Sequence, residues 1–197
     1  MSFSSQYRVF IVIAILIVAL VLASPVISEY MVPPQTEYLT ELSILGPYRN
    51  ATYPFNLTSG DVYPLYLTVT NRLGESAQYQ IQVKFRTPTQ SAPNSFTQTP
   101  SSLPPLCDFT FFVEDKESYE LPIDISFIYQ KTFGREAELN ELVVNDNPVD
   151  ANSVRVAWDS RNDAYLGNLF FELYLYNDEA GSFEYHERYV SLWVNLR

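Results

Sequence analysis

Two hydrophobic patterns divide the chain. Residues 9–27 form one continuous apolar run without a charged side chain, with Arg8 before it and Glu29 after it. From Glu37 almost to the C-terminus, apolar and polar residues instead alternate with a period of two. The first pattern predicts a membrane-spanning helix, because about 20 apolar residues cross a bilayer. The second is typical of strands with one buried face.

The alternating part predicts a series of antiparallel strands. The clearest is 77–86, with Ala77, Tyr79, Ile81, Val83 and Phe85 on one face and Gln78, Gln80, Gln82, Lys84 and Arg86 on the other. We expect it to form a hairpin with 63–69 through a turn at 72–75. Further strands are expected at 38–44, 109–113, 119–129, 154–158, 169–175 and 183–196, with a turn at 177–181 between the last two.

Two segments depart from this alternation. Residues 87–105 are rich in Ser, Thr, Gln and Pro, which predicts a long surface loop. Residues 134–149 are compatible with either a helical turn or a short strand. Because no strand–helix–strand alternation is present, we predict an all-β fold, an antiparallel immunoglobulin-like β-sandwich preceded by one transmembrane helix.

The predicted organisation is a cytoplasmic tail (1–8), a transmembrane anchor (9–27), a stalk (28–35) and an extracellular β-sandwich domain (36–197). Arg8 is the only basic residue before the apolar run, and the positive-inside rule therefore places the N-terminus in the cytoplasm. A cleaved signal peptide ending at Ala23 and a buried soluble helix are the alternatives. Either the anchor or the signal peptide would export the rest of the chain.

Two glycosylation sequons agree with export. They begin at Asn50 and Asn56, and such sites are modified only on the exported side. We therefore expect Asn50 and Asn56 to carry glycans.

Composition limits the partners and the redox chemistry. The net charge of −11 argues against nucleic acid as a partner and against an anionic lipid surface. Cys107 is the only cysteine, so no disulfide forms within the chain, and we expect it to be a small buried hydrophobe.

The residues give little sign of catalysis. His186 is the only histidine, and no Gly-x-Ser-x-Gly motif, phosphate loop or dinucleotide fingerprint is present. A zinc site needs more His or Cys than this chain has. The acidic turns at 145–150 and 159–163 leave calcium open as an alternative, although neither has EF-hand spacing. We predict no enzyme activity, no metal and no cofactor.

Tyrosines supply a candidate interface. Of the 15 Tyr residues, three are expected on the strand faces opposite the aliphatic residues: Tyr66, Tyr174 and Tyr176. Outward tyrosines are common in protein and sugar interfaces. The alternative is that they cover a second packed layer or a sheet edge.

The order of these segments resembles a family of archaeal predicted membrane proteins, the domain of unknown function 1616 family. The resemblance covers about Thr36 to Leu196 and depends on Leu45-Gly46-Pro47, Tyr53-Pro54-Phe55-Asn56-Leu57-Thr58-Ser59-Gly60, Val69-Thr70-Asn71, Tyr79-Gln80-Ile81-Gln82-Val83, Ser118-Tyr119-Glu120 and Ser191-Leu192-Trp193-Val194. Many members have several membrane helices before this domain, whereas this chain has one predicted helix. The family has no established activity, so the resemblance implies no catalytic residues.

Together these features predict a non-catalytic module at the cell surface. Residues 9–27 would contact the lipid bilayer, and the sandwich would contact an envelope protein or a second copy of itself. A carbohydrate-binding or envelope-remodelling module and an accessory subunit of a membrane complex are the alternatives.

Overall fold

The computed structural model describes residues 7, 10–19, 21, 39–94, 96–132 and 135–197, with only the backbone at 152 and 153. The chain divides into two units, Met1–Glu37 and Tyr38–Arg197. Residues 10–19 of the first unit are helical. Among the residues with described positions, no helix is both long and apolar enough to cross a membrane. Positions 9, 20 and 22–27 of the predicted anchor, and all of the predicted stalk, lie outside the described residues.

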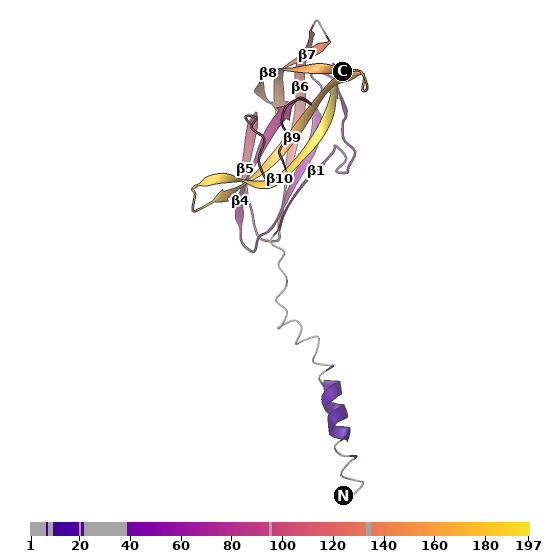
Figure 1. The fold of residues 1–197 in the computed structure, drawn as a ribbon, viewed down its shortest axis with the longest axis vertical. Helices are drawn as coiled ribbons and strands as arrows, with labels where there is room; N and C mark the ends of the chain where they lie inside the picture. The colour runs from indigo at the N-terminus through magenta and orange to yellow at the C-terminus, as the bar shows by residue number, and fades with distance from the viewer. Residues whose placement is uncertain (1–6, 8–9, 20, 22–38, 95, 133–134) are drawn as a thin grey trace. The chain divides into compact units, whose positions relative to one another are not determined.

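The second unit is built from strands, which confirms the predicted all-β fold (Figure 1). The described residues form β1 (Leu39–Leu45), β2 (Asn56–Leu57), β3 (Tyr63–Arg72), β4 (Ala77–Arg86), β5 (Cys107–Val113), β6 (Ser118–Thr132), β7 (Glu136–Val144), β8 (Asn147–Asp159), β9 (Ala164–Asn177) and β10 (Ser182–Leu196).

These strands make a sandwich of two sheets. In the first sheet the order is β1-β3-β6-β7-β8, and in the second it is β5-β4-β9-β10-β2. Neighbours are antiparallel except for β2 and β10, which run parallel. The last residues of β8 pair with the start of β9, so β8 joins the two sheets at one edge.

The core lies between the inward faces of the two sheets. Leu67 of β3 and Ile81 of β4 have no exposed surface, as their alternating positions predict. The rings of Phe85 and Phe127 meet across the core with centroids 5.8 Å apart. Gly167 of β9 makes room for Phe85, because a Cβ at that position would lie 2.2 Å from the ring's Cζ.

The predicted hairpin between 63–69 and 77–86 is wrong. β3 pairs with β1 and β6, whereas β4 pairs with β5 and β9 in the opposite sheet. The turn between them instead crosses from one sheet to the other. Asn71 stabilises this crossing: its Nδ2 donates to the carbonyl oxygens of Glu75 and Val113, and its Oδ1 accepts from the amide of Leu73. Alternation places both strands' apolar faces in the core, but it does not say which sheet each joins.

In the segment 134–149, which the sequence leaves open, Glu136–Val144 form β7 and residues 147–149 begin β8. β7 and the first residues of β8 form a hairpin. Val144 pairs with Asn147 on either side of a tight turn at Asn145 and Asp146. Both turn residues have positive φ, 49° and 63°. Asn and Asp tolerate this left-handed region better than most residues, so they favour the hairpin turn.

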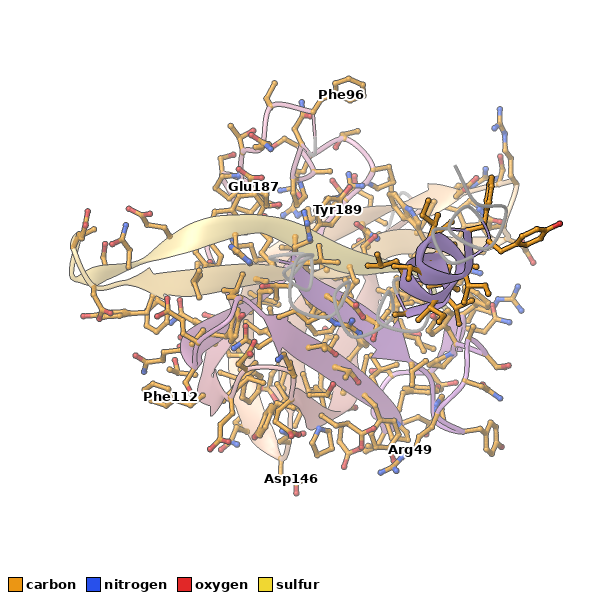
Figure 2. All side chains as sticks on the ribbon, turned by 90° about the horizontal axis from the view of Figure 1, so that it is seen from below. Arg49, Phe96, Phe112, Asp146, Glu187 and Tyr189 are labelled. Carbon is orange, nitrogen blue, oxygen red and sulfur yellow. The ribbon has the colours of Figure 1, made fainter. Side chains whose placement is uncertain are left out.

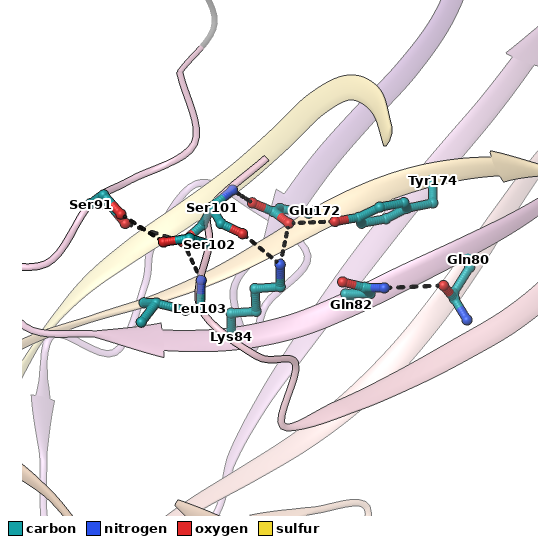
Figure 3. Close-up of polar contacts among 9 residues, drawn as sticks. All are labelled: Gln80, Gln82, Lys84, Ser91, Ser101, Ser102, Leu103, Glu172 and Tyr174. Carbon is teal, nitrogen blue, oxygen red and sulfur yellow. Dashed lines mark hydrogen bonds and ion pairs between the residues drawn. The ribbon is translucent and has the colours of Figure 1, made fainter. Parts of the chain in front are cut away.

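Residues 87–94 and 96–106 belong to a loop that covers part of the outer face of the second sheet (Figure 3). Lys84 faces away from the core, as predicted, but it is only 3% exposed because the loop lies over it. Its Nζ lies 2.7 Å from Oε2 of the fully buried Glu172. The backbone of Ser101 closes the network, since its amide donates to Glu172 Oε1 at 2.6 Å and its carbonyl accepts from Lys84 at 3.2 Å. This buried ion pair holds the loop against the sheet.

Candidate functional site

The β9–β10 hairpin extends past the neighbouring strands (Figure 1), because β4 stops pairing with β9 at Leu175. Asn177 organises the hairpin's turn. Its Oδ1 accepts from the amides of Glu179 and Ala180, and its carbonyl accepts from the amide of Gly181. Gly181 has a φ of +63°, a conformation that glycine adopts without strain. The sequence predicts this turn correctly.

A depression of about 600 Å³ lies against this hairpin. Four carboxylates line it, Glu75 from the β3–β4 crossing and Asp178, Glu179 and Glu184 from the hairpin, together with Leu175, Tyr176, Asn177, Tyr185 and His186. We call it the hairpin depression. The four carboxylates belong to exposed residues, and none forms an ion pair with Lys or Arg within the described part of the chain. The depression is therefore strongly negative.

A bulge in β10 shapes the inner end of the depression. The β9–β10 register shifts between Tyr185 and Arg188, and Glu187 takes a φ of +57° there. His186 consequently reaches the first sheet, where its Nε2 lies 2.8 Å from Oγ1 of Thr40 on β1. The bulge thus couples the hairpin to the opposite sheet.

The hydrogen bond of His186 continues into a buried polar chain. The hydroxyl of Tyr79 donates to Asn71 Oδ1 at 3.1 Å and lies 3.1 Å from Thr40 Oγ1. Because Tyr79 has one proton and donates it to Asn71, Thr40 donates to Tyr79, and His186 Nε2 donates to Thr40. Burial, with a smaller contribution from Arg188, lowers the pKa of His186 below its ordinary value of 6.5. His186 is therefore neutral at pH 7 and acts as a structural donor.

A pair of tyrosines stands beside the depression. Tyr174 and Tyr185 pack edge to face with centroids 5.6 Å apart, and the hydroxyl of Tyr174 donates to Glu172. The hydroxyl of Tyr185 is buried and has no hydrogen-bond partner among the described residues. Burial, followed by the charge of Glu172, raises the pKa of Tyr185 to about 12. Both tyrosines are therefore uncharged near neutral pH.

The groups that line the depression define its chemistry. Its histidine is engaged with Thr40, and no serine or cysteine lines it. In the described ranges, no group of three His, Cys, Asp or Glu side chains has the geometry to hold a metal ion. In the acidic turn at 159–163, a separate part of the chain, the carboxylate of Asp159 accepts hydrogen bonds from the amide of Arg161 and from Asn162 Nδ2. The depression offers carboxylate acceptors and aromatic rings.

The structure separates the three candidate interface tyrosines. Tyr66 lies on β3 in the first sheet, half-buried under the guanidinium of Arg49, whose Cζ is 4.8 Å from the ring centroid. Tyr174 and Tyr176 lie on β9 in the second sheet. Tyr176 lines the hairpin depression and packs edge to face on Phe183 at 5.2 Å. Only Tyr176 of the three therefore belongs to the candidate site.

Both sequon asparagines are exposed in the connection from β1 to β3. Asn50 Oδ1 accepts from the amide of Thr52, and Asn56 Oδ1 accepts from Asn195 Nδ2 of β10. Glycosylation of Asn50 and Asn56 stays a prediction. Cys107 begins β5 and is partly buried, and burial raises the pKa of its thiol to about 11, so it is an unreactive thiol.

The sequence contains part of the signal for this site. The sequence predicts the turn at 177–181 and the outward Tyr176. It also shows that Glu184, Tyr185 and His186 follow one another in the last predicted strand. Glu75 could not be placed there, because its position depends on β3 and β4 belonging to opposite sheets. The place of Tyr185 in the depression likewise depends on the bulge in β10, which a period of two does not predict.

Comparisons with known proteins find a likeness of fold only. No family model and no curated protein matches the chain. The chain is similar to the CARDB domain of a Pyrococcus furiosus protein, solved in complex with di-metal ions, with a TM-score of 0.40 and 9% identity over 84% of this chain and 98% of that one. It is also similar to a beta-glucosidase from Listeria innocua, with a TM-score of 0.42 and 10% identity over 80% of this chain and 16% of the enzyme. At these TM-scores neither likeness informs function.

Proposed function

We propose that the chain is a non-catalytic, membrane-anchored module of the cell surface that binds a basic segment of another envelope protein in the hairpin depression. The observation that carries the proposal is the composition of the depression. It combines four exposed carboxylates that lack a paired cation among the described residues with the rings of Tyr176 and Tyr185.

A lysine or arginine side chain fits this composition. Carboxylates bind guanidinium and ammonium groups through charge-assisted hydrogen bonds. Tyrosine rings attract the same cations through their faces. The net charge of −11 would also steer a basic segment toward the molecule.

The placement at the cell surface is supported by the apolar run 9–27 and by Arg8 before it. The exposure of Asn50 and Asn56 is compatible with glycosylation outside the cell. The strand order, with β1, β3 and β6 facing β5, β4, β9 and β10, supports an immunoglobulin-like sandwich. The resemblance to the domain of unknown function 1616 family supports the same combination of membrane helix and surface domain.

Binding of a labelled hexalysine peptide to the purified full chain tests the proposal, with fluorescence anisotropy as the readout. We expect the double variant Asp178→Asn/Glu179→Gln to bind about three- to tenfold more weakly, because each exposed charge pair is worth up to about 1 kcal/mol. The control is Glu114→Gln/Asp146→Asn, which removes the same charge at exposed positions that do not line the depression. It should bind like the wild type.

Two results would overturn the proposal. If both double variants lose the same affinity, hexalysine binds through overall charge and the depression is no site. If the chain ignores hexalysine but binds immobilised glycans, and Asp178→Asn/Glu179→Gln abolishes that binding, the site belongs to a carbohydrate-binding module instead.

A further inference from the structure

Phe96 is the most exposed large hydrophobic side chain among the described residues, at 98% exposure. It lies at the tip of a small hairpin within the 87–106 loop and points away from the sandwich, above Glu187 and Tyr189 (Figure 2). Leaving a phenyl ring in water is unfavourable relative to burying it. A partner that covers the ring of Phe96 would remove this unfavourable exposure.

The backbone beneath Phe96 is held in place by several hydrogen bonds. Asn94 and Thr99 exchange two backbone hydrogen bonds, and Asn94 Oδ1 accepts from the amide of Phe96. Gln98 Nε2 donates to Glu187 Oε2 at 2.7 Å, which ties the hairpin to β10. Ser101 is fixed to the buried Lys84–Glu172 pair at the base of the loop. Because these hydrogen bonds hold the described residues around Phe96, binding through its ring would lose less conformational entropy than binding through an unrestrained segment.

A groove of about 510 Å³ lies at the base of the same loop, against β8. Its apolar lining comes from Phe85, Leu103, Pro104, Leu106, Ala151 and Val154. Polar residues, among them Gln90 and the exposed Arg155, also line it. The groove thus has an apolar lining and a positive charge.

We propose that Phe96 of one copy occupies the loop-base groove of a second copy, and that the exchange is reciprocal. An aromatic ring suits the apolar lining of the groove, and the volume of about 510 Å³ leaves ample room for it. Glu187, which accepts a hydrogen bond from Gln98 in the same small hairpin as Phe96, is opposite in charge to Arg155 of the groove. The protruding ring and the groove belong to the same loop. A two-fold axis beside that loop therefore lets each copy insert its ring into the groove of the other, which gives a closed dimer. This pairing uses a different surface from the hairpin depression, so it does not depend on the proposed function.

Photocrosslinking of the purified full chain in a mild non-ionic detergent tests this pairing. In the variant Phe96→p-benzoylphenylalanine, we expect a crosslinked dimer whose joined peptides connect position 96 with residues 103–106 or 154 of the other copy. In sedimentation experiments Phe96→Ser should weaken dimerisation roughly tenfold or more, as for an aromatic hot spot. Arg155→Glu should weaken it as well, by charge repulsion with Glu187.

The matched control is Phe112→Ser. Phe112 is also an exposed phenylalanine, at 69%, but it lies on β5 and lines neither the loop nor the groove. It should dimerise like the wild type. Three results would overturn the proposal. The wild-type chain could stay monomeric, or position 96 could crosslink only to detergent or to another part of the surface. Dimerisation could also weaken equally in Phe96→Ser and Phe112→Ser.

Discussion

Lys84 Nζ lies 2.7 Å from Glu172 Oε2, although the two residues are 88 positions apart in the chain. Their side chains are 3% and 0% exposed. Strands β4 and β9 bring them together, and the backbone of Ser101 seals them from solvent. The pair therefore connects two strands of the second sheet with the loop that covers them (Figure 3).

Breaking this pair should destabilise the fold strongly. Lys84→Met leaves Glu172 buried without its cation, and we expect the free energy of unfolding in urea to fall by about 3–5 kcal/mol. The double variant Lys84→Met/Glu172→Leu should lose less, because no buried charge remains. Lys116→Met removes an exposed pair with Asp115, 3.8 Å apart, and should cost less than about 1 kcal/mol. Equal losses in Lys84→Met and Lys116→Met would contradict this account of the buried pair.

The neighbouring tyrosines should respond differently to removal of their hydroxyls. Tyr174→Phe deletes a donor to Glu172 and should cost about 1.5–3 kcal/mol, typical of a hydrogen bond to a charged group. Tyr185→Phe deletes a buried hydroxyl without a partner in the described structure and should be neutral or stabilising. Thermal unfolding of the two variants side by side measures the difference. A larger loss for Tyr185→Phe would mean that its hydroxyl has a partner.

Alkaline pH should destabilise the protein through its buried tyrosines. Burial raises the pKa of Tyr79, Tyr129, Tyr174 and Tyr185 above the ordinary value of 10.0, to about 12 for Tyr185. Above pH 10 the unfolded chain therefore binds fewer protons than the folded chain, so the free energy of unfolding falls as the pH rises from 10 toward 12. Urea unfolding at pH 9, 10 and 11 should show this fall. It should be shallower in Tyr174→Phe/Tyr185→Phe, and an identical slope would contradict the assignment.

Gly167 should tolerate no side chain. The Cβ of Gly167→Ala would lie 2.2 Å from the ring of Phe85, which is packed against Phe127 in the core. We expect a loss of about 1–3 kcal/mol from the displaced ring. Phe85→Leu should relieve part of it, so the double variant Gly167→Ala/Phe85→Leu should be more stable than the sum of the two single losses predicts. Strictly additive losses would show that the ring is not the obstacle.

The strands could be predicted from the sequence because their period of two records which face is buried. Val83 and Leu173 illustrate this, since both alternate with polar neighbours and both are fully buried. The pairing of strands could not be predicted in the same way. The turn after Arg72 suits a hairpin as well as a crossing between sheets, and the hydrogen bonds of Asn71 that stabilise the crossing involve the distant Val113.

The candidate site shows the same limit. The turn at 177–181 follows from its residues, but the contributions of Glu75 and His186 depend on the crossing and on the bulge at Glu187. The alternation places Lys84 on an outward face, and its burial depends on a loop whose polar composition does not indicate that it covers a sheet. Which loop lies over which face of a sheet depends on contacts between residues far apart in the chain, and a local pattern does not record those contacts.

Labelling of intact cells tests the central claim, that the sandwich is displayed on the outer side of a membrane. In a Cys107→Ala background, one variant adds Ala180→Cys at the exposed hairpin tip and another adds Ser4→Cys before the apolar run. A membrane-impermeant maleimide should label position 180 in intact cells and position 4 only after lysis. Labelling of position 4 in intact cells, or of position 180 only after lysis, would contradict the account.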